Sequence, residues 1–181
     1  MATVICITNQ KGGVGKTTTA VNLAFFLAKN KKKTLLIDFD PQGNATSGLG
    51  IDKMPFEADY EKEGTSSTMS EVLLGQKELG EIILNTKFKD LDLAPVTPQL
   101  ANAEVNLAKL DKKFVQLREV IKRIKNLYDY IIIDSPPSLS LLTVNGMIAS
   151  DYLLLPVQTE FYALEGVAQL LDSVKLVRKA M

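Results

Sequence analysis

The 181-residue sequence contains no histidine and only one cysteine, Cys6. Without histidine, the chain cannot use Ser-His-Asp or Cys-His catalysis, ligate zinc through imidazole, or respond to pH through a histidine. A single cysteine cannot form an intrachain disulfide, and it cannot by itself hold an iron–sulfur cluster. These absences exclude several classes of enzyme and metal site before any motif is considered.

Net charge and long apolar runs are also missing. The 21 basic and 21 acidic residues cancel, so no overall field draws the chain toward nucleic acid or membrane. No apolar run approaches ~18 residues and no signal peptide is visible, which predicts a cytoplasmic protein without a membrane partner. The length and the hydrophobic content of 46% suit one α/β domain with its own core.

A glycine-rich segment, residues 9–18 (NQKGGVGKTT), lies between a β-branched run and a helical pattern. In that context its three glycines allow successive backbone N–H groups to approach phosphate oxygens, and the start of the helix adds its positive end. We expect Lys16 to reach the β- and γ-phosphates of a nucleotide and Thr17 to ligate Mg²⁺. The alternative is a turn that carries solvated lysines.

Two later strand patterns end in carboxylates. The run at 34–38 leads into Asp38 and Asp40, and the run at 129–134 ends at Asp134 before a Ser-Pro-Pro segment. The carboxyl ends of parallel strands line the crevice where doubly wound sheets bind ligands. Asp38 and Asp40 point the same way while the strand persists, and Asp134 is expected to hold Mg²⁺ through water. Acids that merely cap a turn would explain one of Asp38 and Asp40 but not both beside a phosphate loop. For Asp134 the alternative is a strand ended by a proline turn.

The phosphate loop departs from the ordinary G-x-x-x-x-G-K-[ST] pattern, because Gln10 stands at the first glycine and Lys11 follows it. The motif K-G-G-x-G-K-T resembles the deviant Walker A of the ParA/MinD ATPases. The segment at 38–50 (DFDPQGNATSGLG) is similar to that of ParA rather than MinD. The missing cluster cysteines separate the chain from nitrogenase iron proteins, which share the loop. The chain is therefore identified as resembling a ParA/Soj-type partition ATPase of chromosomes or plasmids.

This resemblance implies a set of site residues and the cofactors ATP and Mg²⁺. Lys11 is expected to reach the ATP of a partner across a dimer, and Asp40 to position or deprotonate the attacking water. With Lys16, these two form the expected catalytic set. The nucleotide-binding residues are expected to be Lys11, Gly12, Gly13, Val14, Gly15, Lys16, Thr17 and Thr18. The metal-binding residues are expected to be Thr17, Asp38 and Asp134.

The expected fold is a doubly wound, mainly parallel P-loop NTPase sheet with helices on both faces, forming a single domain over residues 1–181. The expected strands are Thr3–Thr8, Thr34–Asp38, Leu91–Pro95, Asp129–Asp134 and Tyr152–Val157. The expected helices cover 18–30, 97–110, 114–128, 139–148 and 164–179, with a capping box from Thr68 to Glu71 opening a short one. Residues 51–66 lack a period and are expected to form a surface loop.

The resemblance further implies an ATP-dependent homodimer, hydrolysis stimulated by a ParB-type protein, and association with the nucleoid through non-specific DNA binding. It covers the N-terminal part of the family, whose DNA-binding arginines would lie beyond Met181, so DNA binding is expected to be weak. Residues 158–166 are expected to roof the nucleotide. From Lys109 to Lys125, seven basic residues against two acids favour a solvated helix face over a DNA contact. Alternatives are a hydrolysis-deficient nucleotide-binding fragment, a MinD-like membrane-associated ATPase, and a tyrosine kinase or ligase-type synthetase built on the same core.

Overall fold

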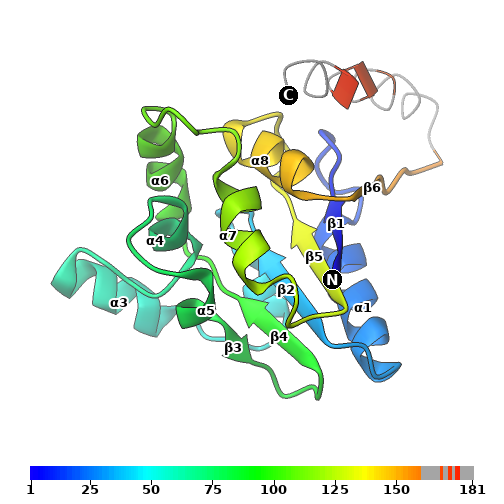
Figure 1. The fold of residues 1–181 in the computed structure, drawn as a ribbon, viewed down its shortest axis with the longest axis horizontal. Helices are drawn as coiled ribbons and strands as arrows, with labels where there is room; N and C mark the ends of the chain where they lie inside the picture. Colours follow the sequence, from blue (N-terminus) through cyan, green and yellow to red (C-terminus); the bar gives the residue numbers. More distant parts are fainter. Residues whose placement is uncertain (160–167, 169–170, 173, 176–181) are drawn as a thin grey trace.

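The computed structural model describes residues 1–159, 168, 171, 172, 174 and 175. In this part of the chain a six-stranded sheet has the order β3-β4-β2-β5-β1-β6 (Figure 1). The strands are β1 (Thr3–Ile7), β2 (Thr34–Asp38), β3 (Leu84–Asn85), β4 (Leu91–Ala94), β5 (Tyr130–Asp134) and β6 (Tyr152–Leu154). All neighbours are parallel except β3 and β4, so the predicted doubly wound, mainly parallel sheet is confirmed.

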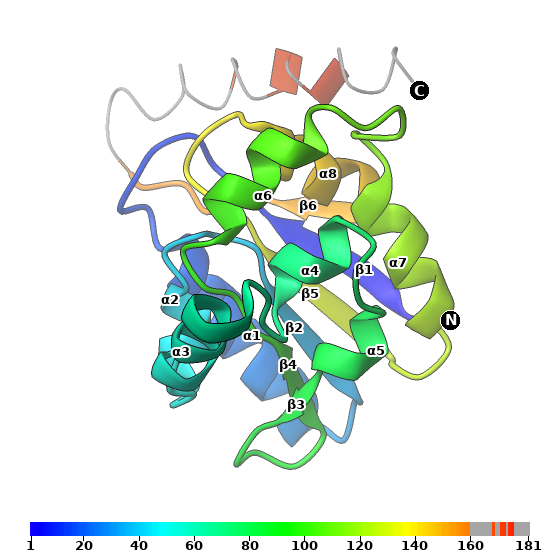
Figure 2. The same cartoon turned by 90° about the vertical axis from the view of Figure 1, so that its left-hand side faces the viewer.

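Helices cover both faces of the sheet (Figures 1 and 2). One face carries α1 (Lys16–Lys29) and α2 (Asn44–Gly48). The other face carries α4 (Met69–Leu73), α5 (Leu79–Ile82), α6 (Leu100–Leu107), α7 (Gln116–Ile124) and α8 (Leu141–Ala149). Along β2, Leu36 packs in the core on the face covered by α1 and α2, whereas Leu35 and Ile37 pack in the core on the opposite face. Because side chains alternate along a strand, a run that is apolar at every position fills both cores.

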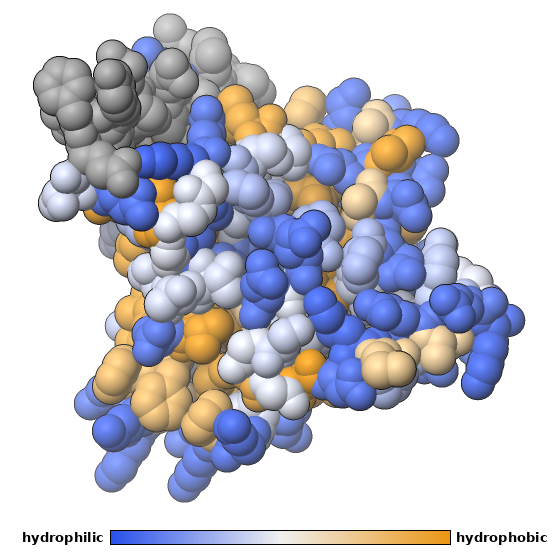
Figure 3. Space-filling view, turned by 180° about the vertical axis from the view of Figure 1, so that it is seen from behind, coloured by the Kyte–Doolittle hydropathy of each residue, from blue (hydrophilic) through white to orange (hydrophobic). Residues whose placement is uncertain are grey.

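The first helix lies close to the sheet because its inner face is made of alanines. Ala20, Ala24 and Ala28 recur every four residues and are buried against the sheet. Two phenylalanines lie farther out on this helix: Phe25 packs edge-on against Phe88, with ring centroids 5.0 Å apart, and Phe26 is 52% exposed. Figure 3, which views the molecule from behind, shows hydrophobic side chains gathered over this region.

Several expectations need correction. Residues 51–66 were expected to form a loop, but they contain α3 (Met54–Glu63), with Pro55 in its first turn and Gly64 at φ +70° after its end. None of its residues is buried, so no apolar period marked it in the sequence. The helix expected from residue 114 begins only at Gln116, as α7, and Phe114 lies outside it and is 47% exposed. The two-residue strand β3 and the short helices α2 and α5 were not predicted, and several predicted elements are one to four residues too long at one or both ends.

The capping box is confirmed. The Glu71 carboxylate accepts hydrogen bonds from the backbone N–H and the hydroxyl of Thr68, at 3.2 and 2.9 Å. The expected helix at 164–179 lies largely outside the described residues, as does most of the expected nucleotide roof at 158–166. Among the residues that the structure describes, no helix is long and apolar enough to span a bilayer.

Candidate functional site

The register of the sheet brings the predicted site residues to one edge. In the pairing of β5 with its neighbours, Asp134 lies beside Ile7 of β1 on one side and beside Asp38 of β2 on the other. The glycine-rich loop leaves β1 at the same level. A cavity of about 360 Å³ opens there. It is lined by Gly12, Gly13, Gly15, Lys16, Thr17, Thr18, Asp40, Gln42, Asn44 and Pro137.

The loop holds its shape through glycine backbone and two side-chain anchors. Gly13 and Gly15 have φ of +73° and +86°, in the left-handed region that favours glycine, and Gly15 caps the start of α1. Asn9 accepts a hydrogen bond from the Lys11 N–H at 3.0 Å and donates to the Pro156 carbonyl at 2.7 Å. The Gln158 amide donates to the Gly13 carbonyl at 3.2 Å. The loop is therefore fixed to the segment that follows β6.

Lys16 lies inside this loop and is only 6% exposed. Its ammonium group donates to the Lys11 carbonyl at 3.3 Å. Burial lowers the pKa of Lys16, while the negative charges of Asp134 and Asp40 raise it. The loop thus places a cation where the N–H groups at the start of α1 also point, an arrangement suited to a polyphosphate.

Asp134 is fully buried, and neither of its carboxylate oxygens has a hydrogen-bond partner among the described residues. Burial raises the pKa of Asp134 to about 7; the Thr17 hydroxyl and Lys16 lower it, and Asp38 and Asp40 raise it. A buried carboxylate without a partner is costly unless a cation offsets it. Beside a hydroxyl, it offers the oxygen ligands that Mg²⁺ prefers. These residues therefore fit a magnesium ion.

Asp38 and Asp40 occupy different environments. Asp38 is fully buried and accepts hydrogen bonds from the backbone N–H and the hydroxyl of Thr46, both at 2.7 Å. Burial raises the pKa of Asp38 to about 6, although the hydrogen bonds from Thr46 lower it. Asp40 lines the cavity and accepts a hydrogen bond from the Gln42 N–H at 3.0 Å. Asp40 can thus meet a ligand directly, whereas Asp38 is held behind the cavity wall.

Other predicted residues divide by exposure. Lys11, Gly12, Gly13 and Thr18 are exposed, and Val14 is the buried residue among the loop positions 11–15. Gln42, Asn44 and Thr46 also belong to this edge, although no role was predicted for them. The sequence feature that could have pointed to them is the polar residue at every second position, which continues from Asp38 and Asp40 through Gln42, Asn44 and Thr46. In the described part of the chain, no group of three carboxylate or thiol side chains could hold a metal alone, so phosphate and water would complete a magnesium shell.

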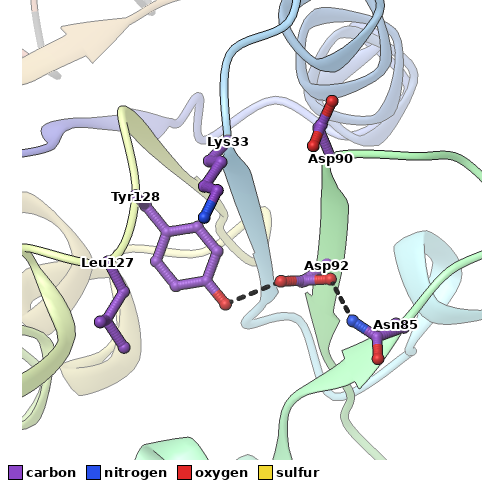
Figure 4. A pocket seen from close by; sticks show the side chains of 6 residues that line it. All are labelled: Lys33, Asn85, Asp90, Asp92, Leu127 and Tyr128. Atoms are coloured by element: carbon purple, nitrogen blue, oxygen red, sulfur yellow. Dashed lines mark hydrogen bonds between the residues drawn. The ribbon is translucent and has the colours of Figure 1, made fainter.

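A second cavity of about 340 Å³ lies at the opposite end of the strands (Figure 4). Its wall includes Lys33 before β2, Asp90 before β4, and Leu127 and Tyr128 before β5. Asp92 accepts hydrogen bonds from the Asn85 amide at 2.8 Å and from the Tyr128 hydroxyl at 2.9 Å. Both of its oxygens therefore have partners, and none of the predicted site residues reaches this cavity.

A glycine-rich loop that opens a helix, beside acid-ended parallel strands, is the arrangement of a P-loop NTPase. Residues 2–181 match the AAA_31 family, described as an AAA domain. The chain is 51% identical over 179 residues to the sporulation initiation inhibitor protein Soj of Bacillus subtilis, covering 99% of this chain and 67% of that protein. It is 47% identical over 178 residues to the chromosome partitioning protein ParA of Myxococcus xanthus, covering 98% of this chain and 60% of that protein.

A solved structure has a similar fold. Cobyrinic acid a,c-diamide synthase from Mycobacterium smegmatis, with a bound ATP analogue and magnesium, superposes with a TM-score of 0.89 at 34% identity, over 99% of this chain and 69% of that one. The chain spans about 60 to 67% of the length of the two partition-type relatives. From the family match and these identities, the chain belongs to the ParA/Soj family of P-loop ATPases.

Proposed function

We propose that this chain binds Mg²⁺-ATP at the phosphate loop and hydrolyses it. The observation that carries the proposal is the buried, unpartnered carboxylate of Asp134, which lies beside the Thr17 hydroxyl and Lys16. Thr17 and Asp134 would hold the magnesium ion, and Asp38, set behind the cavity wall, would contribute through the water of its hydration shell. When bound, the ion neutralises charge on the β- and γ-phosphates. The Mg²⁺ and ATP-analogue complex of the similar synthase supports the same cofactors here.

In this proposal the residues of the chain have separate tasks. The loop N–H groups and the Lys16 ammonium bind the phosphates, so Lys16 exchanges its hydrogen bond with the Lys11 carbonyl for phosphate oxygens. Asp40, on the cavity wall, accepts a hydrogen bond from the attacking water and orients it toward the γ-phosphate. Little covalent work is required of the protein, since phosphoryl transfer depends on positioning and charge.

Lys11 is proposed to act across a homodimer. Its backbone N–H is held by Asn9, and the residue is exposed on the outer lip of the loop, while Lys16 already occupies the inside. An outward lysine could neutralise the γ-phosphate of a partner packed face to face across two ATP molecules. An arginine finger supplied in trans accelerates hydrolysis by ~10³–10⁵-fold. A lysine lacks the bidentate guanidinium fork, so we expect a smaller acceleration from Lys11.

We further propose that the cycle serves the partition of chromosomes or plasmids, as the names of the Soj and ParA relatives suggest. The ATP dimer of a single-domain protein would associate with the nucleoid in the cytoplasm, and a ParB-type protein would stimulate hydrolysis. Non-specific DNA binding by residues 1–181 is expected to be weak. On α7, Lys122 pairs with Glu119 and Arg123 with Glu78, so these cations are partly neutralised.

A synthetase is the second candidate, because the diamide synthase is a close structural match. The two activities differ in what ATP turnover requires. A partition ATPase hydrolyses ATP without any acceptor acid, whereas a synthase of this kind must couple turnover to an amide-forming reaction. Turnover that appears only with an added carboxylic acid and an amide donor would favour the synthetase. The higher identity to the partition-type relatives favours the ATPase.

The sharpest test of the proposal mixes two inactive variants, Lys11→Ala and Lys16→Ala. In a mixed dimer, one site combines its own Lys16 with the Lys11 of the partner, so activity should return to about a quarter of wild type after random exchange. Lys32→Ala, an exposed lysine after α1, is the control and should neither lose activity nor affect complementation. Mixed dimers that demonstrably form and yet stay inactive would exclude a role for Lys11 across the interface.

A further inference from the structure

Thr46 lies on α2, eight residues after Asp38, and is fully buried. Its backbone N–H and its hydroxyl both donate to the same oxygen of Asp38, Oδ2, at 2.7 Å. Within the described part of the chain, the other oxygen, Oδ1, accepts only a long hydrogen bond of 3.4 Å from the Asp40 N–H. The two oxygens of one carboxylate are therefore unequal: one is held by two short bonds and the other keeps acceptor capacity.

The direction of the Thr46 hydroxyl follows from its second partner. The Val96 backbone N–H donates to the Thr46 Oγ1 at 3.3 Å. An N–H group can only donate, so the hydroxyl oxygen uses a lone pair there and directs its proton to Asp38. Val96 follows β4, which pairs with β2, so both ends of this short chain of hydrogen bonds are fixed to the same sheet.

We propose that Thr46 is a positioning residue, which orients the Asp38 carboxylate so that Oδ1 faces the hydration shell of magnesium. The inference rests on the proposed Mg²⁺-ATP function and adds to it a residue that contacts neither the metal nor the nucleotide. Ligating and water-ordering carboxylates need outer partners that fix their rotation, and losing such a partner typically costs ~10- to 100-fold in metal affinity or activity. Among the described residues, Thr46 supplies two of the three hydrogen bonds that Asp38 receives.

A merely structural role makes a different prediction. If Thr46 only tied α2 to the sheet, its loss would weaken the fold and lower affinity for nucleotide with or without magnesium. If it positions Asp38, its loss should reduce the gain in affinity that magnesium provides. The ratio of nucleotide affinities measured in magnesium and in EDTA separates the two.

The test uses the full chain and the non-hydrolysable analogue AMP-PNP, titrated by calorimetry in MgCl₂ and in EDTA. Thr46→Val keeps the volume and removes the hydroxyl donor, and we expect the magnesium-dependent gain in affinity to fall about 10-fold or more, with affinity in EDTA unchanged. Thr46→Ser restores the donor and should restore the gain. Thr34→Val is the matched control: Thr34 is fully buried at the other end of β2, and its hydroxyl donates to the Lys32 carbonyl at 2.9 Å.

Asp38→Ala completes a double-mutant cycle, in which adding Thr46→Val to Asp38→Ala should change the magnesium-dependent gain no further. A wild-type gain in folded Thr46→Val, or equal losses in magnesium and EDTA, would overturn the inference and leave the proposed function standing. Thr46→Ala and Thr46→Cys repeat the measurement if Thr46→Val does not fold. Wild-type protein that shows no magnesium-dependent binding would refute the proposed function, and the role of Thr46 with it.

Discussion

Replacing Asp134 with asparagine should make the nucleotide-free protein more stable at neutral and alkaline pH. Burial raises the pKa of Asp134 from its ordinary value of 3.8 to about 7, and its oxygens have no partners among the described residues. A carboxyl group whose pKa is raised on folding is tolerated while protonated, and it opposes folding once it must ionise. The neutral amide has a similar shape and avoids that ionisation.

The magnitude follows from the two pKa values. At pH 8 the folded protein must hold an ionised Asp134, and a rise from 3.8 to about 7 costs about 4 kcal/mol of unfolding free energy. At pH 4 the penalty is below about 1 kcal/mol, because the group is protonated in the folded state and largely so in the unfolded chain. The stability advantage of Asp134→Asn should therefore grow as pH rises from about 4 to about 7, then level off.

Urea unfolding at pH 4, 6 and 8, in EDTA and without nucleotide, measures this difference. Asp151→Asn is the control of opposite sign. Burial alone would raise the pKa of Asp151, but the Val4 N–H and the Lys125 ammonium group together lower it, so this substitution should destabilise the protein at pH 8. If Asp134→Asn proved as stable as wild type, or less stable, at pH 8, Asp134 could not be an unpaired buried charge awaiting a cation.

Two further predictions concern hydrolysis and DNA. Asp40→Ala should bind Mg²⁺-ATP with near wild-type affinity in calorimetry yet lose phosphate release, since it removes water activation rather than phosphate contacts; hydrolysis at the wild-type rate would return Asp40 to the role of a turn residue. Binding of a DNA duplex should be weak in fluorescence anisotropy, fall steeply with salt, and change little in Lys122→Gln or Lys125→Gln, because Glu119 and Asp151 already pair with these lysines. Tight, ATP-dependent DNA binding near physiological salt would contradict this.

The elements that position the site could be predicted because strong local signals agree there. The all-apolar runs of β2 and β5 fill cores on both faces, and only a buried parallel strand suits such a run. Gly13 and Gly15 adopt left-handed backbone, which explains their place in the motif. The loop and the acid-ended strands were therefore expected to meet at one edge of the sheet, and Lys16, Asp40 and Asp134 lie at that edge.

The features that could not be predicted are of two kinds: elements that are exposed or very short, and contacts between residues far apart in the sequence. Helix α3 has no buried residue, so no period marked it, and β3 has only two residues. The contrast between Asp38 and Asp40 was also hidden. It arises because Thr46 donates to Asp38 and is itself bound by the Val96 N–H, and Val96 is 50 residues away from Thr46 in the chain. The pairing that neutralises α7, such as Arg123 with Glu78 on another segment, is likewise invisible to a count of basic residues.

The most direct test of the account is calorimetric titration of Mg²⁺-ATP into wild-type protein and into Lys16→Ala. Lys16 is almost completely buried inside the loop, and in the proposed function its charge meets the β- and γ-phosphates. Wild type and the control Lys32→Ala should bind with the same affinity, and Lys16→Ala should show no measurable binding while unfolding as cooperatively as wild type. Equal affinity in Lys16→Ala and wild type would contradict the assignment of this loop as a phosphate-binding site.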